Sequence, residues 1–546
     1  MRELRTEVVI VGSGAGGATV AKELSKQLKK VIIIEKGPSI KQVGSQRAAL
    51  GFYDKHGLFS KSKEGIIIYR AIMTGGTTIV SCGNAIRSLE NELKAKGIDL
   101  GEEFEEAEKE LNVAPISDRL IGEGTKRIMG SANSLGFEME PMVKFAGLDG
   151  CVSCGNCVLG CQKDKKWTTL RYLNQAKLNG VSLLTNTTVT EVLISNGRAI
   201  GVKGIGPRGK ITVFADAVIL AAGGIGTPII LQNSGITEAG NKLFVDLFNV
   251  TYGITKNFGL TREPCMAIVS HKFRDAGFIL SPFVDSSLVL ASMFQISKAL
   301  CRKRILGIMT KIKDDYIGKV NRDGSIEKAV TANDLVKLNY GASIAKEILK
   351  KTGAYPDSII VTKPRGAHPG GTAAIGEVVD ENQQTRIKRL FVCDASVLPT
   401  SPGLPPILTI VALSKRFAKE FLRGRERREF KRLMKSLPVR IIIDDKEEAE
   451  LLPLIASNIS EDGIFVETMN LKEDFLCKIR AKSRKINLIV ALPEWLKEVR
   501  LTADLVWEKR ETFPLEKSYG MGMRFTEMAI NERNKLSSYI SEMSGF

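Results

Sequence analysis

The stretch TEVVIVGSGAGGA, residues 6–18, decides the fold of this chain. A β-branched apolar run leads directly into Gly12, Gly14 and Gly17, and an amphipathic segment follows as far as Leu28. This order predicts a strand, a tight turn and a helix. The glycine spacing allows the turn, a close approach of backbone to a pyrophosphate, and close packing of helix on strand. The helix N-terminus then offers free N–H groups to the phosphates.

A second apolar run, Val31–Ile34, ends at Glu35. A carboxylate at this point would accept hydrogen bonds from a ribose and would repel a 2′-phosphate. We therefore expect a dinucleotide-binding fold, although this region alone does not say which dinucleotide. The alternative is an ordinary strand–helix turn without a ligand.

Composition indicates a globular protein of several domains, because the 546 residues are 43% hydrophobic and 26% charged. No apolar run approaches the roughly 18 residues of a transmembrane helix. The first predicted strand begins too close to Met1 for a signal peptide, so we expect a cytoplasmic protein. The net charge of +18 is spread along the chain without an aromatic-interleaved basic groove, which argues against a nucleic-acid partner.

The basic charge leaves peripheral contact with the inner membrane face as an open alternative. The apolar stretch Phe278–Leu300 is followed by Cys301-Arg302-Lys303-Arg304. This pattern fits a core helix with a basic end, and it also fits a face that leans on a membrane and delivers an apolar substrate.

Four of the nine cysteines form one run with the pattern C-x-x-C-x-x-C-x-x-x-C: Cys151, Cys154, Cys157 and Cys161. Thiolates this close can bind a soft metal centre, and the spacing is that of a bacterial ferredoxin run. A proline after the last cysteine and a second run are both missing. A single cluster could take three ligands from the run and one from Cys82 or Cys265. An iron–sulfur cluster, a zinc site and reduced packing cysteines all remain open.

Further glycine-rich segments are far apart along the chain. Residues 217–228 predict a second buried strand that opens through glycines into a helix, and Gly75, Gly76 and Thr77 would let backbone run close against a flat ligand. We therefore expect a discontinuous dinucleotide-binding domain. At Arg423 the composition becomes strongly basic, which predicts a linker, and short alternating runs then predict an antiparallel β domain.

Six motifs in this order resemble the glucose–methanol–choline (GMC) oxidoreductase family: Gly12–Gly17, Glu35, Gly75-Gly76-Thr77, Gly223–Pro228, His368-Pro-Gly-Gly-Thr and Phe391-Val-Cys-Asp-Ala-Ser. The resemblance covers about residues 1–422 and implies FAD. The cofactor contacts that it implies come from Gly12, Gly14 and Gly17 (pyrophosphate), Glu35 (adenosine ribose), Val189 (adenine), Gly75, Gly76 and Thr77 (isoalloxazine), and Asp394 (ribityl and pyrophosphate). The cysteine run is similar to one in the cholesterol-oxidase-like branch of the family.

His368 is the candidate catalytic base. Oxidation of an alcohol needs a base for the hydroxyl proton while hydride leaves for flavin N5, and a histidine with an ordinary pKa near 6.5 suits that role. Pro405 departs from the family, which usually has Asn or His at this position. Because proline has no side-chain donor or acceptor, either another group replaces it or the reaction differs, for example reduction of a carbonyl or alkene.

The tail resembles the PilZ domain, which binds cyclic di-GMP. The residues that carry the resemblance are Arg428, Arg432, Asn458, Ser460 and Gly463. Guanidinium groups bind phosphates bidentately and stack on guanine, and Asn and Ser can hydrogen-bond to base or phosphate. The alternative is a basic linker followed by an unrelated barrel.

The resulting fold class is α/β, with a discontinuous Rossmann-like FAD-binding domain, an α+β substrate domain and a C-terminal antiparallel β-barrel. The expected boundaries are 1–90, 175–240 and 360–422 for the FAD-binding domain, 91–174 and 241–359 for the substrate domain, and 423–546 for the PilZ-like barrel.

We expect an FAD-dependent oxidoreductase that acts on CH–OH groups of a small-molecule alcohol or carbonyl substrate and is regulated by cyclic di-GMP. The sequence names neither the substrate nor the electron acceptor. Two alternatives remain open: a non-catalytic cyclic di-GMP effector that uses flavin or the cysteines as a redox sensor, and a flavin-dependent reductase of a carbonyl or alkene.

Overall fold

The computed structural model divides the chain into two compact units, Met1–Glu420 and Phe421–Phe546. It describes residues 2–40, 42–54, 59–145, 148, 150–286, 289–290, 302–433, 437–442, 454–459, 463–469, 477, 486–492, 498–512 and 517–544.

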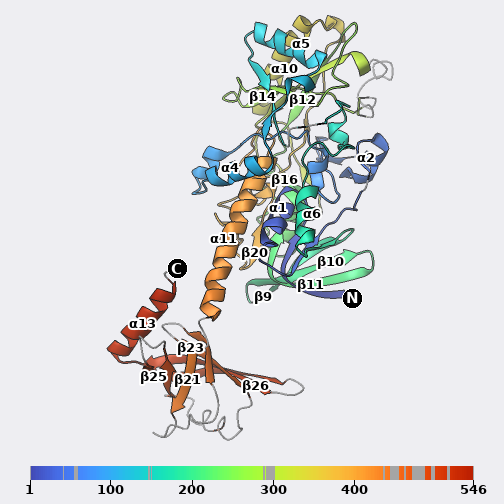
Figure 1. Cartoon of the computed structure of the whole chain (residues 1–546). Coiled ribbons are helices and arrows are strands. Elements are labelled where there is room, and N and C mark those ends of the chain that lie inside the picture. The colour runs from blue at the N-terminus through green and yellow to red at the C-terminus, as the bar shows by residue number, and fades with distance from the viewer. Residues whose placement is uncertain are drawn as a thin grey trace. The chain divides into compact units, whose positions relative to one another are not determined.

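A seven-stranded mixed sheet forms the base of the first unit (Figure 1). Its strands run in the order β8-β2-β1-β11-β10-β9, and β20 also pairs with β11. Their bounds are β1 Arg2–Val11, β2 Val31–Ile34, β8 Ser182–Leu184, β9 Thr188–Ser195, β10 Arg198–Gly206, β11 Gly209–Leu220 and β20 Leu390–Val392. β1 pairs in parallel with β2 and β11, whereas β9 and β10 join the sheet antiparallel. Strands from distant parts of the chain thus form one sheet, and this confirms the expected fold class.

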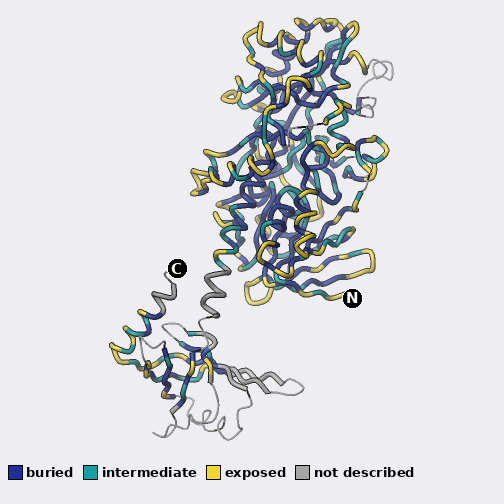
Figure 2. Tube along the Cα trace, viewed as in Figure 1, coloured by how far each residue is buried: buried dark blue, intermediate teal, exposed yellow. Residues whose placement is uncertain are grey.

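Helices cover this sheet and bury its central strands. Val8, Val9 and Ile10 are fully buried, as a parallel strand covered on both faces requires (Figure 2). Helix α1 (Ala15–Leu24) begins directly after β1, and α7 (Gly223–Asn233) directly after β11. Both helices therefore start at the carboxyl ends of parallel strands, where open α/β sheets bind ligands.

A nine-stranded sheet forms the second layer of this unit, in the order β3-β4-β19-β12-β15-β14-β13-β6 with β18 beside β12. Its strands are β3 Ser60–Lys61, β4 Ile67–Ile68, β6 Met139–Pro141, β12 Phe248–Ile254, β13 Ile268–Ser270, β14 Phe278–Pro282, β15 Ile305–Ile312, β18 Ile360–Val361 and β19 Arg365–Gly366. Helix α10 (Ala332–Thr352) packs against β12, β14 and β15 of this sheet, and α5 (Glu123–Ser134) packs against α10. β3, β4, β18 and β19 come from ranges that we assigned to the FAD-binding domain. They belong to this sheet because β4 pairs with β19, and β18 and β19 pair with β12.

The stretch expected as a core helix from Phe278 begins as strand β14 instead, antiparallel to β15. An apolar run of this kind can form either a helix or a strand, and here its pairing with a neighbouring buried strand favours the strand. Residues 287–288 and 291–301 of that stretch lie outside the described residues. In the described part of the chain, no helix combines the length and apolarity needed to cross a bilayer.

Helix α11 runs from Ile407 to Leu433 without a break. The linker expected from Arg423 therefore starts inside a helix, and the boundary between the units, at residues 420 and 421, also falls within it. Lys, Arg and Glu are good helix formers, and the first proline after Ile407 is Pro438. A run of charge without apolar periodicity indicates a solvated segment but does not exclude a helix.

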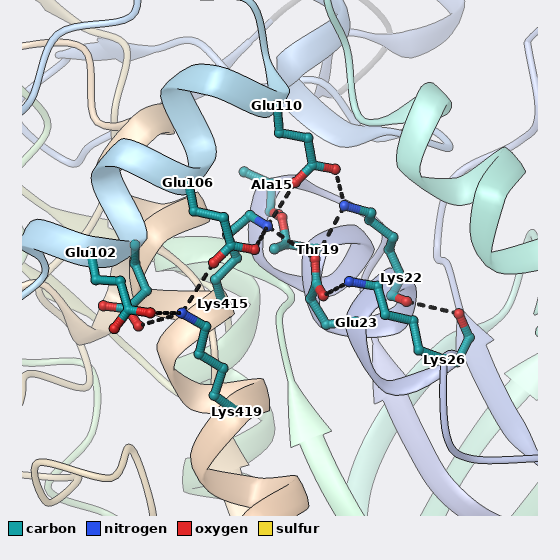
Figure 3. Close-up of polar contacts among 12 residues, drawn as sticks. Ala15, Thr19, Lys22, Glu23, Lys26, Glu102, Glu106, Glu110, Lys415 and Lys419 are labelled. Atoms are coloured by element: carbon teal, nitrogen blue, oxygen red, sulfur yellow. Dashed lines mark hydrogen bonds and ion pairs between the residues drawn. The ribbon is translucent and has the colours of Figure 1, made fainter.

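Ion pairs join α11 to α1 and to α4 (Gly101–Glu110), as Figure 3 shows. The ammonium of Lys415, only 1% exposed, lies 3.1 Å from Glu23, 2.8 Å from Glu106 and 2.7 Å from Glu110. Lys22 also pairs with Glu110. Ligand oxygens of these three glutamates lie within 4.8 Å of one another, but lysine ammonium groups already pair with all three, so we assign no metal here.

The second unit contains a closed barrel of six antiparallel strands in the order β21-β22-β23-β26-β25-β24. Their bounds are β21 Leu437–Ile442, β22 Leu454–Ile459, β23 Gly463–Met469, β24 Ile486–Ala491, β25 Glu498–Thr512 and β26 Lys517–Glu527. Helix α13 (Ile530–Ser544) closes the chain. Alternate residues such as Val439, Ile441, Val466 and Met521 form the core, which confirms the predicted antiparallel barrel.

Candidate functional site

A cavity of about 450 Å³ lies in the first unit, at the carboxyl ends of β1, β2 and β11. Most of the residues predicted for the cofactor and for catalysis line it: Gly12, Gly14, Glu35, Gly76, Thr77, Val189, His368 and Asp394. Pro405 also lines it. Residues from distant parts of the chain thus meet in one place.

Two glycines leave open space on the cavity side. A Cβ atom added at Gly14 or at Gly223 would meet no atom within 4 Å. Gly14 precedes the first turn of α1 and Gly223 begins α7, so two helix N-termini border the same cavity. This arrangement favours a ligand with negative charge, such as a pyrophosphate.

Gly17 and Gly75 contribute to packing rather than to the cavity wall. A Cβ at Gly17 would lie 2.1 Å from the carbonyl oxygen of Gly12, so glycine is needed for the close contact of α1 with the turn. Gly75 has a left-handed backbone with φ of 90°. Its N–H donates to Ser13 Oγ at 3.0 Å, which ties the second glycine-rich segment to the first.

Glu35 is held at the end of β2 by the turn that follows β1. Its carboxylate accepts hydrogen bonds from the Ser13 N–H at 3.0 Å, from the Ser13 hydroxyl at 2.6 Å and from the Gly37 N–H at 2.7 Å. Burial raises the pKa of this carboxyl above its usual value. Glu35 also lines the cavity, at the end of β2.

Asp394 links the N-terminus of α7 to the segment after β20. One carboxylate oxygen accepts from the Gly223 N–H at 2.8 Å and from the Thr227 hydroxyl at 2.5 Å. The other accepts from the Ser396 N–H at 2.8 Å. Burial raises the pKa of Asp394. These hydrogen bonds hold the start of α7 and the segment after β20 together at the edge of the cavity.

His368 follows β19 and reaches the cavity with its side chain 25% exposed. Its Nδ1 lies 2.9 Å from Asp246 Oδ2 and 2.8 Å from Lys311 Nζ. Burial and the Lys311 ammonium lower the pKa of His368, while Asp246 raises it, and the net effect is downward. The ring is therefore neutral at neutral pH, and Nε2 is the nitrogen left for a substrate.

Asp246 and Lys311 are functional candidates that the sequence analysis missed. Lys311 Nζ lies 2.8 Å from Asp246 Oδ2, and Asp246 Oδ1 accepts from the Gly403 N–H at 3.0 Å. Burial alone would raise the pKa of Asp246, but Lys311 and His368 hold it below its usual value. A lysine within the otherwise apolar strand β15 was the available signal, since a buried charge needs a partner.

This pair belongs to a larger buried network. Ser401 Oγ lies 2.8 Å from a carboxylate oxygen of Asp246 and 2.8 Å from one of Asp314, and Asp314 pairs with Lys328 at 2.8 Å. Two carboxylates and two ammonium groups thus balance in charge behind His368. A network satisfied in this way holds its members rigidly.

The sequence was also compared with models of known protein families and with known proteins. Residues 7–261 and 325–414 match the two models described as GMC oxidoreductase, and residues 426–542 match the PilZ domain. An uncharacterized protein of Methanocaldococcus jannaschii is 33% identical over 422 residues, which cover 76% of this chain and 100% of the relative. The chain belongs to the GMC oxidoreductase family. A PilZ domain follows its oxidoreductase domain.

Relatives and solved structures of GMC oxidoreductases extend this result. Long-chain-alcohol oxidase FAO3 of Arabidopsis thaliana is 23% identical, over 77% of this chain and 69% of its own. Pyridoxine 4-oxidase from Mesorbium loti superposes with a TM-score of 0.60 at 16% identity, over 77% of this chain and 99% of its own. A variant of Aspergillus oryzae formate oxidase, studied for its FAD modification, gives 0.61 at 14%, over 78% and 99%. At these identities the structures establish the fold alone.

FAD is the cofactor of this GMC oxidoreductase, and the cavity fits it. The open faces of Gly14 and Gly223 and the two helix N-termini suit the pyrophosphate. Glu35 suits the adenosine ribose, and Val189, on β9, suits the adenine. Gly76 and Thr77 also line the cavity.

Pro405 lies in the cavity wall of this GMC oxidoreductase, where the family usually offers Asn or His. The group that approaches His368 instead is Lys311, from a different strand and the opposite ring nitrogen. Lys311 also lines the cavity. In the described part of the chain, the side chains that contact the His368 ring by hydrogen bonding, Lys311 and Asp246, both do so at Nδ1.

The cysteines of the predicted run differ in their exposure. Cys154 is exposed, whereas Cys157 lies in contact with the buried Cys265, whose thiol also contacts Cys82. Hydrogen bonding from the Cys265 thiol lowers the pKa of both neighbours. Cys82 lines the cavity, so this group of thiols borders the flavin site.

The predicted cyclic di-GMP residues lie mostly outside the part of the PilZ domain that can be described. The side chains of Arg428, Arg432 and Asn458, and all of Ser460, lie outside the described part of the chain. Gly463 begins β23, and a Cβ there would lie 2.6 Å from the carbonyl oxygen of Met523. Close approach of β26 thus explains why this position is glycine.

Proposed function

We propose that this GMC oxidoreductase oxidises the CH–OH group of an alcohol, with His368 as the base. The observation that carries the proposal is the 2.9 Å contact between His368 Nδ1 and Asp246 Oδ2 on a ring that lines the cavity. When the Nδ1–H donates to this carboxylate, Nε2 keeps its lone pair and can accept the hydroxyl proton.

The residues behind the histidine keep it oriented for this step. Asp246 is fixed by Lys311 at 2.8 Å, by Gly403 at 3.0 Å and by Ser401 at 2.8 Å. The lowered pKa of His368 leaves the ring neutral and able to accept a proton at neutral pH. Bound FAD supplies the hydride acceptor.

The cavity favours an alcohol with an apolar body. Apolar side chains from the second sheet and its loops line the cavity: Phe248, Met266, Phe283 and Met309. Pro405 and Ile407 add further apolar surface on the side where the family usually has a polar residue. The similarity to a long-chain-alcohol oxidase supports the same substrate class.

Anaerobic mixing with a graded series of primary alcohols tests this function. We expect bleaching of the flavin by alcohols of increasing chain length, and a loss of about 10²- to 10⁴-fold in rate for His368→Ala. His271→Ala, a histidine outside the cavity lining, is the control and should not change the rate. A flavin that stays oxidised with every alcohol, or an active His368→Ala variant, would favour the non-catalytic effector instead.

A second function, reduction of a carbonyl or alkene, is favoured by the contact of 2.8 Å between Lys311 Nζ and His368 Nδ1. If the ammonium donates to Nδ1, the ring carries its proton on Nε2 and becomes a donor toward a substrate oxygen or carbon. Mixing dithionite-reduced enzyme with enones and aldehydes, and following flavin reoxidation, separates this reaction from alcohol oxidation.

We further propose that the PilZ domain binds cyclic di-GMP and regulates the oxidoreductase. Arg428 and Arg432 would bind the phosphates and stack on guanine, Asn458 and Ser460 would hydrogen-bond to the ligand, and Gly463 would permit the close strand approach. α11 carries both arginines, and it also carries Ile407 and Ile410, which line the cavity. One continuous helix therefore connects the two sets of residues in the chain.

Titration calorimetry with cyclic di-GMP tests the binding, and flavin reduction with and without the ligand tests the regulation. We expect binding to be lost in Arg428→Ala and Arg432→Ala, and kept in Arg440→Ala, an arginine outside the motif. Unchanged affinity in Arg428→Ala would contradict the assignment of the site.

A further inference from the structure

A tyrosine in the cavity wall has a hydroxyl proton that no other described residue accepts. Tyr69 directly follows β4 and lines the cavity. Its phenolic oxygen accepts a hydrogen bond from Arg365 Nη1 at 2.9 Å, and in the described part of the chain this is its only side-chain hydrogen bond. A guanidinium group only donates, so the phenol is the acceptor in this contact and its own O–H is left for another partner.

Arg365 is itself held in place by a carboxylate. It is 1% exposed, and its Nη1 and Nη2 lie 3.1 Å and 2.9 Å from the two oxygens of Asp285. Contact at two points fixes the plane of the guanidinium. Asp285 also accepts from the Tyr252 hydroxyl at 2.7 Å. Tyr69, Arg365 and Asp285, which we call the Tyr69 group, therefore form a rigid buried support for the phenolic oxygen.

Aromatic packing holds the ring of Tyr69 as well. The centres of the Phe59 and Phe248 rings lie 4.7 Å and 6.4 Å from the centre of the Tyr69 ring. Arg365 Cζ lies 5.0 Å from the centre of the Phe248 ring, so the same guanidinium contacts both the phenol and an aromatic neighbour. Phe59 and Phe248 also line the cavity. The O–H of Tyr69 therefore keeps a fixed place in the wall.

Tyr69 keeps its proton at neutral pH and acts as a donor. Burial and the Asp285 carboxylate raise the pKa of Tyr69 above its usual value, and together they outweigh the lowering effect of Arg365. An oxygen that already accepts from a cation is a stronger donor toward a further acceptor, because hydrogen bonds in a chain polarise one another.

A second tyrosine of the cavity wall shows the contrast. Tyr53 also lines the cavity, but its O–H donates to the carbonyl oxygen of Val158 at 2.6 Å. The proton of this phenol is therefore used within the protein. Among the described lining residues, Tyr69 is the phenol whose O–H is left for a bound molecule.

Tyr69 and His368 belong to separate polar groups of the same cavity. The charges that act on the pKa of Tyr69 come from the Tyr69 group, and those that act on the pKa of His368 come from Lys311 and Asp246. Among the described residues, no side-chain hydrogen bond joins the two groups. The same wall contains large apolar side chains: Phe248, Met266, Phe283 and Met309. A molecule in this cavity can therefore form hydrogen bonds at two separate places.

We propose that Tyr69 binds a second oxygen of the substrate, while the reacting hydroxyl lies at His368. This inference rests on the proposed alcohol oxidation and narrows its substrate class. The substrate is an alcohol with an apolar body and a further oxygen that accepts a hydrogen bond, such as an ether, a carbonyl or another hydroxyl. A molecule without an oxygen at this place leaves the buried O–H unsatisfied, which lowers its affinity.

Isomeric ether alcohols test this role of Tyr69. They are primary alcohols of one chain length in which an ether oxygen replaces the methylene at successive positions, so they differ only in where that oxygen lies. Anaerobic stopped-flow reduction of the flavin gives a dissociation constant for each isomer. We expect wild-type protein to bind one isomer about 3- to 10-fold more tightly than the others. The isomers should bind equally to Tyr69→Phe, whereas Tyr53→Phe, the matched control, should keep the preference.

Equal affinity for all isomers in the wild type, or a preference that persists in Tyr69→Phe, overturns the proposal. Flavin content per chain reports whether each variant is folded. If Tyr69→Phe loses its flavin, Tyr69→Met removes the O–H with a side chain of different shape. A flavin that no alcohol reduces contradicts the proposed oxidation but not the role of Tyr69, because titration calorimetry with the same unreacted isomers then measures the preference directly.

Discussion

Lys311 Nζ lies 2.8 Å from His368 Nδ1 and touches the ring on the side away from the nitrogen left for a substrate. Asp246 Oδ2 lies 2.9 Å from the same Nδ1. A single ring nitrogen cannot both donate to the carboxylate and accept from the ammonium. The balance between these two bonds therefore decides whether Nε2 acts as a base or as a proton donor.

Lys311→Met tests this balance through the pH dependence of flavin reduction. Burial and the Lys311 ammonium both lower the pKa of His368, so wild-type enzyme keeps a neutral base into acidic solution. Without the ammonium the pKa of His368 rises, and the acidic limb of the rate profile moves to higher pH. We expect a several-fold loss of rate below neutral pH and little change at pH 8.

Lys313→Met is the matched control, because Lys313 pairs with Glu92 at the surface, with 43% of its side chain exposed. Its rate profile should match that of the wild type. An acidic limb that stays in place in Lys311→Met would show that the ammonium does not act on the histidine.

Asp246→Asn should lower both the free energy of unfolding and the rate of flavin reduction. The substitution leaves the Lys311 ammonium, 3% exposed, without its carboxylate, and breaking a buried pair in this way costs about 3–5 kcal/mol. The histidine also loses the group that orients it. Urea unfolding measures the stability. Glu377→Gln, which removes an exposed pair with Lys242, should cost at most about 1 kcal/mol. Equal midpoints for the two variants would contradict the buried pair.

Gly14→Ala and Gly17→Ala should separate cofactor binding from folding. Gly14 has φ of −73°, which alanine adopts freely, and its Cβ would enter only the open cavity. We expect Gly14→Ala to fold normally but to hold much less FAD. Gly17→Ala would place a Cβ 2.1 Å from the Gly12 carbonyl oxygen, and such overpacking costs about 1–3 kcal/mol or more. Flavin absorbance per chain and melting of the flavin-free proteins distinguish the two. A full flavin content in Gly14→Ala would contradict the expectation that a Cβ at this position interferes with FAD binding.

The glycine-rich turn and Glu35 could be predicted because they depend on local backbone pattern, whereas His368 was predicted from the resemblance of its motif to the GMC family. A turn of fixed glycine spacing after a β-branched run has few other solutions. Asp246 and Lys311 were not predicted because they come together only in the tertiary structure. The two residues are 65 positions apart in the sequence and meet only when β12 pairs with β15. No rule based on the spacing of residues along the sequence predicts such a pair.

The predicted helix and strand boundaries were wrong where the local sequence pattern and the tertiary contacts favour different structures. The apolar run at Phe278 reads equally as helix or strand, and pairing of β14 with β15 decided for strand. The basic segment after Arg423 reads as a linker, although its residues are good helix formers.

Lys415→Met should destabilise the oxidoreductase domain in a way that depends on pH. Hydrogen bonding from Lys26 and the charges of Lys415 and Lys22 outweigh the effect of burial and lower the pKa of Glu23 to about 2. An unfolded chain ionises this carboxyl near pH 4.3. Its contribution to stability is therefore complete above about pH 4.3 and is lost as the pH falls through about 2.

In Lys415→Met the pKa of folded Glu23 rises, and Glu23, Glu106 and Glu110 lose the one buried ammonium that pairs with all three. We expect a loss of about 3–5 kcal/mol at pH 7, shrinking as both proteins approach pH 2. Lys419→Met removes an ammonium that is 32% exposed on the same helix and should cost less. Urea unfolding at a series of pH values measures both. A difference from wild type that stays constant from pH 7 to pH 2 would mean that Lys415 acts through packing rather than through the charge of Glu23.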